Sequence, residues 1–257
     1  MAAINDLPIN VPGIRLSAIA AGIRYSGRRD LVVMELAPGS TTSGVFTQNA
    51  FCAAPVTLCR EHLQRAEPRF FLVNTGNANA GTGQQGRLAA LRCCQALAQK
   101  AGVNPEQVLP FSTGVIGEAL PEQKIIDALD EALASLASDQ WQEAATGIMT
   151  TDTVPKLISK TVILGGKEVT VCGIAKGAGM IKPNMATMLG YVFTDAVLAK
   201  PDLQTLLATA ASQSFNRITV DGDTSTNDCC MLVATGASGV EVSKLPGSAY
   251  QDFEAAL

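Results

Sequence analysis

The sequence is poor in histidine, since His62 is the only one among 257 residues. Histidine is the usual general base near neutral pH, so a Ser-His or Cys-His catalytic pair would depend on that one side chain. His62 lies in the polar, helix-like stretch CREHLQRAEP, where we expect it to be exposed to solvent. Histidine pairs and CxxC spacings are both absent, so we expect no metal site.

Charged residues are also scarce, at 16%, and the net charge is −4. Binding to phosphates needs a basic surface, so the composition argues against nucleic acid as a partner. No run of about 18 apolar residues could span a bilayer, and the N-terminal stretch MAAINDLPINVPGIR has no signal-peptide pattern. We therefore expect a cytoplasmic protein without a membrane segment.

Seven cysteines are present, but they do not form the patterns of a disulfide framework or a metal site. Two adjacent pairs, Cys93-Cys94 and Cys229-Cys230, are geometrically unsuited to such a framework. We expect reduced thiols, most of them buried.

Apolar residues make up 47% of the chain, enough for a large core. Short apolar runs predict buried strands, and stripes at helical spacing that begin at proline or end at glycine predict helices. The glycine pair at 165–166 lies between two alternating runs and predicts a β-hairpin. An α+β or α/β layered domain follows. Strands are expected at 31–36, 70–73, 158–164, 169–175 and 229–234, and helices at 84–100, from 121, from 201 and from 250.

Two motifs match known binding patterns in part but lack the spacing or the residues that those sites need. GTGQQG, Gly81 to Gly86, fits GxGxxG, but seven residues separate it from the preceding apolar run, too many for the tight turn of a dinucleotide site. DGDTSTND, Asp221 to Asp228, lacks the terminal glutamate of a calcium loop. We expect a plain glycine-rich loop in the first case and a loop with side chains bonded locally to backbone in the second.

The stretch KGAGMIKPNMATML, Lys176 to Leu189, offers a way to perform acyl chemistry without a histidine. If the Thr187 hydroxyl attacked the Ala186 carbonyl, cleavage would leave Thr187 as a new N-terminus. Its α-amine, with a pKa of about 7.7–8, could then act as the base for its own hydroxyl. A glycine-proline turn leading into a strand is the plainer interpretation of the same residues.

KGAGMIKPNMATML closely resembles the cleavage motif of the ornithine acetyltransferase family, also called glutamate N-acetyltransferase. Further segments resemble the family in the same order: GVFTQNAFCAAPVTLCREHL, FFLVNTGNANAGTGQQG, FSTGVIGE, MTTDTVPK and DGDTSTNDC. The resemblance extends from about Gly13 to Cys230. It assigns GTGQQG to a family loop rather than to a nucleotide site.

The resemblance implies a precursor that cuts itself before Thr187, giving an α chain of residues 1–186 and a β chain that starts with 187–257. It implies that Thr187 carries acetyl from N2-acetyl-L-ornithine to L-glutamate in arginine biosynthesis. Thr113 and Gly114 match the oxyanion-hole pair, and Thr153, Lys176 and Thr187 match substrate-binding positions. The implied fold is a layered αββα-type sandwich like that of related aminopeptidases.

The resemblance further implies a heterotetramer of two α and two β chains and no bound cofactor; some members accept acetyl-CoA as a co-substrate. Family members continue well beyond Leu257, so some substrate-binding residues have no counterpart here, and we expect a C-terminally truncated chain. Three alternatives stay open: an aminopeptidase or amidase on the same fold, a nucleotide-binding domain that uses GTGQQG, and an inactive truncated fragment.

Overall fold

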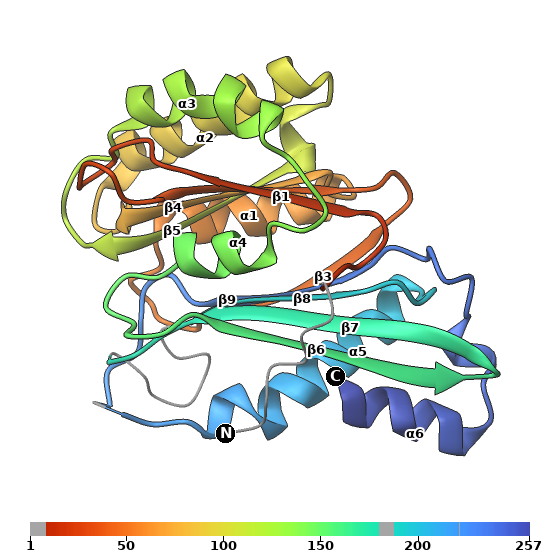
Figure 1. The fold of residues 1–257 in the computed structure, drawn as a ribbon. Helices are drawn as coiled ribbons and strands as arrows, with labels where there is room; N and C mark the ends of the chain where they lie inside the picture. Colours follow the sequence, from red (N-terminus) through yellow and green to blue (C-terminus); the bar gives the residue numbers. More distant parts are fainter. Residues whose placement is uncertain (1–8, 180–187, 221) are drawn as a thin grey trace.

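The computed structural model describes residues 9–179, 188–220 and 222–257, in which two β-sheets pack face to face between layers of helices (Figure 1). The first sheet has the strand order β1-β2-β4-β5 and the second β3-β9-β8-β7-β6. The strands of the first sheet are β1 (Ile14–Ile19), β2 (Leu31–Leu36), β4 (Phe70–Asn77) and β5 (Val108–Val115). Those of the second are β3 (Thr41–Phe46), β6 (Lys156–Leu164), β7 (Lys167–Lys176), β8 (Leu189–Thr194) and β9 (Cys229–Ala234).

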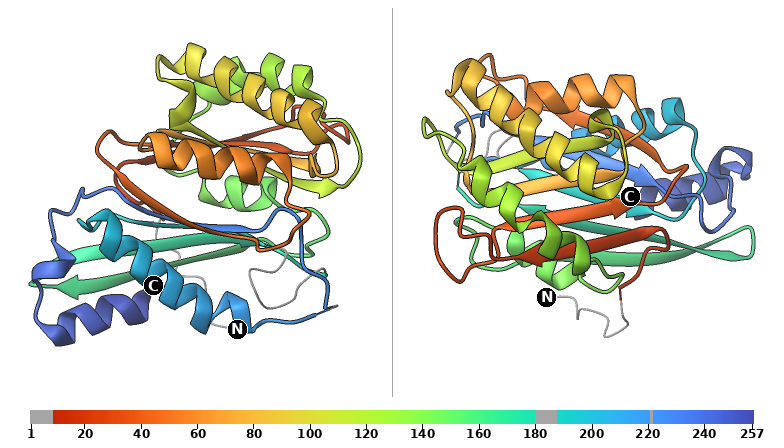
Figure 2. Two further views of the ribbon diagram at one scale, coloured as in Figure 1. Left: turned by 180° about the vertical axis from the view of Figure 1, so that it is seen from behind. Right: turned by 90° about the horizontal axis from the view of Figure 1, so that it is seen from above.

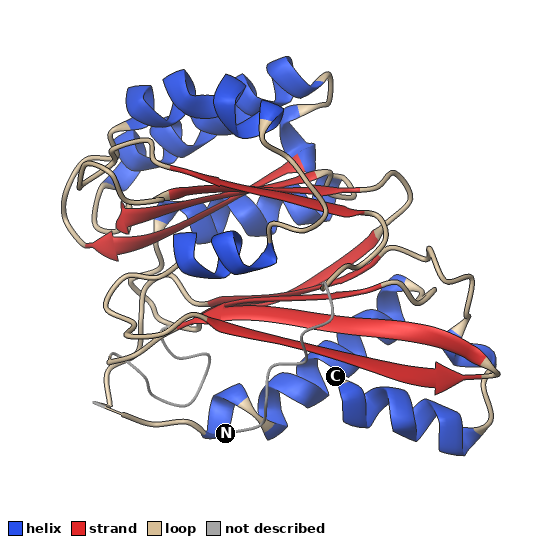
Figure 3. Ribbon diagram, in the orientation of Figure 1, coloured by secondary structure: helices blue, strands red, loops and turns tan. Residues whose placement is uncertain are grey.

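Helices cover the outer face of each sheet, as Figure 3 shows by colour. Helices α2 (Gly83–Ala101) and α3 (Glu122–Ala134) pack on the first sheet, and α5 (Lys200–Gln213) and α6 (Gly247–Ala256) on the second. Helix α1 (Ala54–Arg65) contacts edge strand β5, and α4 (Trp141–Gly147) contacts edge strand β1, on opposite sides of the molecule in the view from above (Figure 2). The order helix, sheet, sheet, helix confirms the predicted αββα sandwich.

A shared apolar core fills the space between the two sheets. Phe71 and Phe111 of the first sheet meet Tyr191 and Phe193 of the second, and the Phe111 and Tyr191 rings meet edge-on at 5.2 Å. Trp141 of α4 stacks edge-on against Phe193 at 5.4 Å. Edge-on ring pairs of this kind stabilise a packed core beyond the area they bury. The sheets are therefore held in a fixed relation, which matters because the site described below takes residues from both.

The predictions of strands, helix ends and turns agree with the structure where they rested on a strong sequence pattern. The strands at 31–36 and 229–234 have the predicted bounds, and α2 ends at Gly102, whose φ of +69° is left-handed. The Gly165-Gly166 turn has positive φ at both residues, as a tight hairpin between β6 and β7 requires. All seven cysteines are free and six are buried, as predicted.

The prediction for His62 was wrong. The side chain is only 2% exposed, and its Nδ1 lies 2.8 Å from the Val108 carbonyl oxygen, which accepts the ring N–H. His62 therefore joins α1 to the start of β5. The flanking charges of CREHLQRAEP suggested exposure, but one face of this amphipathic helix is buried against β5.

The buried thiols predict loss of stability at alkaline pH. Burial raises the pKa of Cys93, Cys172 and Cys230 to about 12, while in the unfolded chain a thiol titrates near its ordinary value of 9. Between these values the folded state holds more protons than the unfolded state, so the free energy of unfolding falls as pH rises above about 9. Each such thiol contributes a slope of up to about 1.4 kcal/mol per pH unit.

Urea unfolding between pH 8.5 and pH 11 would measure this slope. We expect Cys93→Ala in α2 to make it shallower, and Cys52→Ala, which removes a half-buried thiol, to leave it close to that of the wild type. Equal slopes in all three proteins would contradict the prediction.

Within the described ranges, none of the helices is long and apolar enough to cross a lipid bilayer.

Candidate functional site

The strand directions bring several chain ends together at one end of the sandwich. Strands β4 and β5 are parallel, so Thr75 pairs with Thr113 and Gly76 with Gly114 where both strands end. In the second sheet, the end of β7 pairs with the start of β8, and the start of β9 lies beside that of β8. Loops that leave these strand ends enclose a cavity of about 530 Å³.

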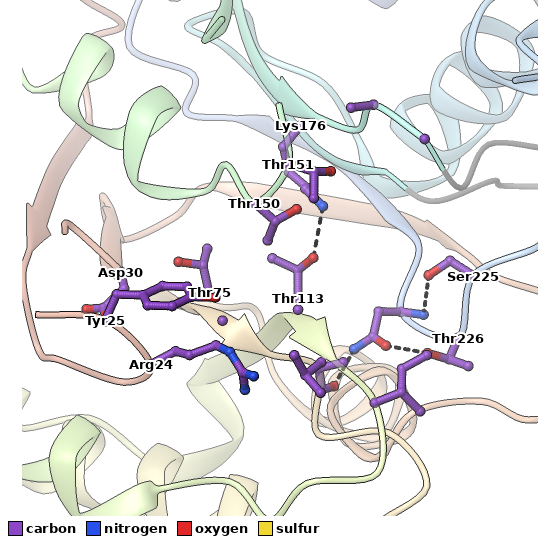
Figure 4. Close-up of a pocket in the computed structure, with 18 of the residues that line it drawn as sticks. Arg24, Tyr25, Asp30, Thr75, Thr113, Thr150, Thr151, Lys176, Ser225 and Thr226 are labelled. Atoms are coloured by element: carbon purple, nitrogen blue, oxygen red, sulfur yellow. Dashed lines mark hydrogen bonds between the residues drawn. The ribbon is translucent and has the colours of Figure 1, made fainter. Parts of the chain in front are cut away.

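Figure 4 shows the polar side chains of this cavity gathered from both sheets and from three loops. Two of the predicted site residues, Thr113 and Lys176, line it and are hydrogen-bonded to each other. The predicted Gly114 also lines it. The residues labelled in Figure 4 are Arg24, Tyr25, Asp30, Thr75, Thr113, Thr150, Thr151, Lys176, Ser225 and Thr226.

Gly114 occupies a position that only glycine can fill. Its φ is +136°, and a Cβ atom there would overlap the Gly76 carbonyl carbon and lie 2.5 Å from the Asn77 nitrogen. These are backbone atoms of the paired strand β4, and the side-chain amide of Asn77 in turn donates to the Ala119 carbonyl at 3.0 Å. The missing side chain thus lets the ends of β4 and β5 approach each other beside the cavity.

Lys176 and Thr113 form a buried polar contact between the two sheets. The Lys176 Nζ donates to Thr113 Oγ1 at 2.9 Å, and the two residues are 4% and 6% exposed. Burial lowers the pKa of Lys176 below its ordinary value, and the carboxyl groups of Asp152 and Asp228 offset part of that shift. A partly desolvated ammonium group at a cavity wall is well placed to pair with a carboxylate ligand.

The polar turn MTTDTVPK contributes to the site through different residues from the one predicted. Thr150 and Thr151 line the cavity, whereas Thr153 is exposed and is not one of its lining residues. Asp152 has a fully buried side chain and holds the turn in place. Its Oδ1 accepts from Lys156 Nζ at 2.6 Å and from the Gly177 amide at 2.8 Å. Burial opposes ionisation, but these hydrogen bonds outweigh it and lower the pKa of Asp152.

The loop DGDTSTND does more than bond locally. The local bond exists, since the Asn227 amide donates to Ser225 Oγ at 3.1 Å. The Asn227 side chain also crosses to the first sheet, where its Nδ2 donates to the carbonyls of Ala78 at 2.6 Å and Ser112 at 2.9 Å. Asn227 therefore ties the start of β9 to the end of β5, a role that no local pattern indicates.

The loop of residues 20–30 forms another wall of the cavity, and the sequence analysis did not identify it. The buried Asp30 accepts hydrogen bonds from the amides of Ala21 at 2.8 Å and Ile23 at 2.6 Å, which folds the loop around its carboxylate. Arg28 Nη2 donates to the Met149 carbonyl at 2.6 Å and so joins this loop to the turn MTTDTVPK. The arrangement places Arg24 and Arg28 on the cavity wall.

In GTGQQG, Gly86 has a structural reason for its presence, and the residues from Gly83 onward begin α2 rather than form a plain loop. A Cβ at Gly86 would overlap Thr82 Oγ1 and Asn79 Oδ1, which are hydrogen-bonded to each other at 2.8 Å. Asn79 has a left-handed backbone with φ of +48°, and its Nδ2 donates to the Gly86 carbonyl at 2.9 Å. The motif therefore shapes the start of α2.

Ala186 and Thr187, the predicted cleavage and nucleophile positions, lie outside the residues that the structure describes, and so does Asp221. In the part that it does describe, no three or more His, Cys, Asp or Glu side chains form a group that could hold a metal ion.

Comparison with known proteins identifies the family. The model of the ArgJ family matches residues 15–257. The chain belongs to the ArgJ family. Among curated ArgJ-family relatives, the arginine biosynthesis bifunctional protein ArgJ of Psychrobacter arcticus is 59% identical over 92% of this chain. The protein of the same name from Pseudomonas syringae pv. tomato is 55% identical over 96%. The chain spans 58% and 61% of the lengths of these two relatives.

Solved structures agree with the ArgJ assignment. The arginine biosynthesis bifunctional protein of Bacillus halodurans is 32% identical, with a TM-score of 0.61 over 68% of this chain and 91% of that one. The ornithine acetyltransferase of Mycobacterium tuberculosis, solved with ornithine, is also 32% identical, with a TM-score of 0.59 over 67% and 92%. An L-aminopeptidase D-Ala-esterase/amidase from Ochrobactrum anthropi, 12% identical, shares the fold with a TM-score of 0.59 over 96% of this chain and 80% of that one.

Proposed function

We propose that this ArgJ chain carries the acetyl-transfer site of an arginine-biosynthesis enzyme acting in the cytoplasm. It moves an acetyl group from N2-acetyl-L-ornithine to L-glutamate. The observation that carries the proposal is the buried contact of Lys176 with Thr113, because it puts a cation and a hydroxyl donor at one wall of one cavity. The ornithine bound to the Mycobacterium tuberculosis enzyme supports the same class of substrate.

The proposed reaction has two transfers. The Thr187 hydroxyl attacks the acetyl carbonyl, its proton passes to the freed α-amine, and ornithine leaves with its nitrogen protonated. The acetyl ester of Thr187 is then attacked by the amine of glutamate, which gives N-acetylglutamate and restores the hydroxyl. Thr113 and Gly114 donate hydrogen bonds to the tetrahedral oxygen in both steps, an effect worth roughly 3–4 kcal/mol per donor in other enzymes.

Substrate binding is proposed for Lys176 and Thr187. For Thr153 it stays a prediction from the family resemblance, because Thr153 is exposed and is not one of the residues that line the cavity. Lys176 pairs with the α-carboxylate that both substrates carry. We further propose that cleavage before Thr187 divides the chain into residues 1–186 and a part starting with 187–257, which assemble as a tetramer of two chains of each kind. No bound cofactor is needed, and acetyl-CoA is proposed as an additional acetyl donor.

The decisive assay incubates the purified chain with N-acetylornithine and glutamate and follows N-acetylglutamate by mass spectrometry. We expect equal amounts of ornithine and N-acetylglutamate. Free acetate without N-acetylglutamate would instead indicate an amidase, the activity class of the fold relative from Ochrobactrum anthropi. A parallel reaction with acetyl-CoA in place of N-acetylornithine tests the second donor.

Lys176→Met should weaken transfer by roughly 100-fold in kcat/KM, since loss of one partner of a buried charge pair typically costs 2–5 kcal/mol. The loss should be much smaller for the carboxamide analogue of N-acetylornithine, which has no carboxylate to pair. Lys160→Met on β6 changes an exposed lysine of the same sheet and serves as the control. An equal loss on both substrates would exclude the proposed pairing.

A further inference from the structure

Asp228 is a buried carboxyl group to which the sequence analysis and the proposed reaction give no role. It is 1% exposed and precedes β9 directly. Its Oδ1 accepts the backbone N–H of Met188 at 2.7 Å, and the next amide along, that of Cys229, donates to the Met188 carbonyl at 3.0 Å. The backbone of Met188 is therefore bonded at both its N–H and its C=O by two consecutive residues.

Met188 follows Thr187 in the sequence, so this pair of bonds fixes the chain one residue after the proposed nucleophile. A matching bond occurs on the other side of the same passage, where Asp152 Oδ1 accepts the Gly177 amide at 2.8 Å. Two buried carboxyl groups from different loops thus hold Gly177 and Met188, the residues on each side of 178–187. A displacement of about 1 Å at a reacting group can cost on the order of 100-fold in rate, so such anchors bear directly on reactivity.

The loop that carries Asp228 is itself held firmly. The Thr47 amide donates to the Asp228 carbonyl at 2.9 Å, and Thr47 Oγ1 donates to the Ser225 carbonyl at 2.8 Å. Thr47 directly follows strand β3, which ends at Phe46. These bonds hold the backbone of Asp228 from the β3 side, whereas Met188 lies on the β8 side. In contrast to Oδ1, the buried Oδ2 of Asp228 has no hydrogen-bond partner among the described residues.

We propose that Asp228 is a positioning residue for the Thr187 chemistry, acting through its hydrogen bond with the Met188 amide. The inference rests on the proposed function. It requires the carboxyl oxygen as a hydrogen-bond acceptor for that amide.

Burial raises the pKa of Asp228 to about 8, against the opposing effects of the Met188 amide, of Ser225 and of Lys176. A carboxyl oxygen can accept the Met188 N–H whether the group is charged or neutral, so the acceptor role does not depend on its charge.

Two substitutions separate the acceptor role from a general packing role. Asp228→Asn keeps a carbonyl oxygen for the Met188 amide, whereas Asp228→Ala removes it. By intact mass over time, we expect the Ala variant to cleave before residue 187 roughly 100-fold more slowly than wild type and the Asn variant to recover most of that loss. Asp195→Ala is the matched control, because Asp195 is a buried carboxylate that follows the other end of β8 and accepts the Thr170 amide at 2.8 Å.

The outcomes are distinct. Wild-type chain that neither cleaves nor transfers acetyl overturns the proposed function itself. Wild-type activity combined with equal cleavage rates in the Asn and Ala variants overturns the positioning role alone. If Asp228→Ala fails to fold, Asp228→Leu, which has a similar branched shape but no acceptor atom, takes its place in the comparison with Asp228→Asn.

Discussion

Thr187→Ala should remain one species of 26.7 kDa, whereas wild type should separate into residues 1–186 and 187–257 on a denaturing gel. Alanine has no hydroxyl to attack the Ala186 carbonyl and none to carry acetyl. Both self-cleavage and transfer should therefore disappear, with kcat for transfer reduced on the order of a million-fold, as when other enzymes lose their nucleophile. Intact mass and the N-acetylglutamate assay measure the two losses separately.

Thr187→Ser should keep part of both activities, because serine retains the hydroxyl and, once released, the α-amine. Thr161→Ala, at an exposed position of β6, controls for the loss of a threonine from the same sheet. Cleavage of the Thr187→Ala chain at the same bond would refute the proposed mechanism, since the sequence neighbours Ala186 and Met188 carry no hydroxyl.

Gly114→Ala should have the second largest effect. The added Cβ would meet the backbone of Gly76 and Asn77, which cannot move without breaking the pairing of β4 with β5. Overpacking against backbone costs about 1–3 kcal/mol, and the left-handed φ of +136° adds strain. The amide proposed for the oxyanion hole would be displaced, so transfer should fall by at least about 100-fold.

Gly117→Ala isolates the steric part of this effect. Gly117 lies three residues further along, also has a left-handed φ of +85°, and has open space where a Cβ would be added. It should lose only about 1–2 kcal/mol from backbone strain and retain most of its transfer activity. If urea midpoints and transfer rates change equally in the two variants, crowding between β4 and β5 is not what requires glycine at 114.

The main elements of the fold could be predicted because their signals are local. Short apolar runs located β2 and β9, the glycine pair at 165–166 located the hairpin of β6 and β7, and Gly102 marked the end of α2. Strand β4 was predicted as 70–73 but runs to Asn77, because its polar second half is paired with β5 rather than marked by an apolar pattern. The order of strands within each sheet required long-range pairing and was not predicted.

At the site, the sequence predicted the residues that belong to family motifs, but it did not predict the buried polar residues that hold them in place. Thr113, Gly114 and Lys176 follow from the family motifs, and the structure brings these three together at one cavity. Asp152 and Asp228 stood in stretches interpreted as turn and loop, since aspartate is common in turns and nothing local distinguishes a buried one. Asn227, which joins the two sheets, was hidden for the same reason.

The sequence by itself determined the family, the alternation of strands and helices, and the residue types available for acyl transfer with a single histidine. Only the tertiary structure decided which polar side chains are buried and what they bond to. His62 is buried because β5 offers it a carbonyl, and Asp228 has a pKa of about 8 because burial outweighs its hydrogen bonds. The spacing of apolar residues can be read along the chain, but desolvation and hydrogen-bond partners depend on segments up to 223 residues apart.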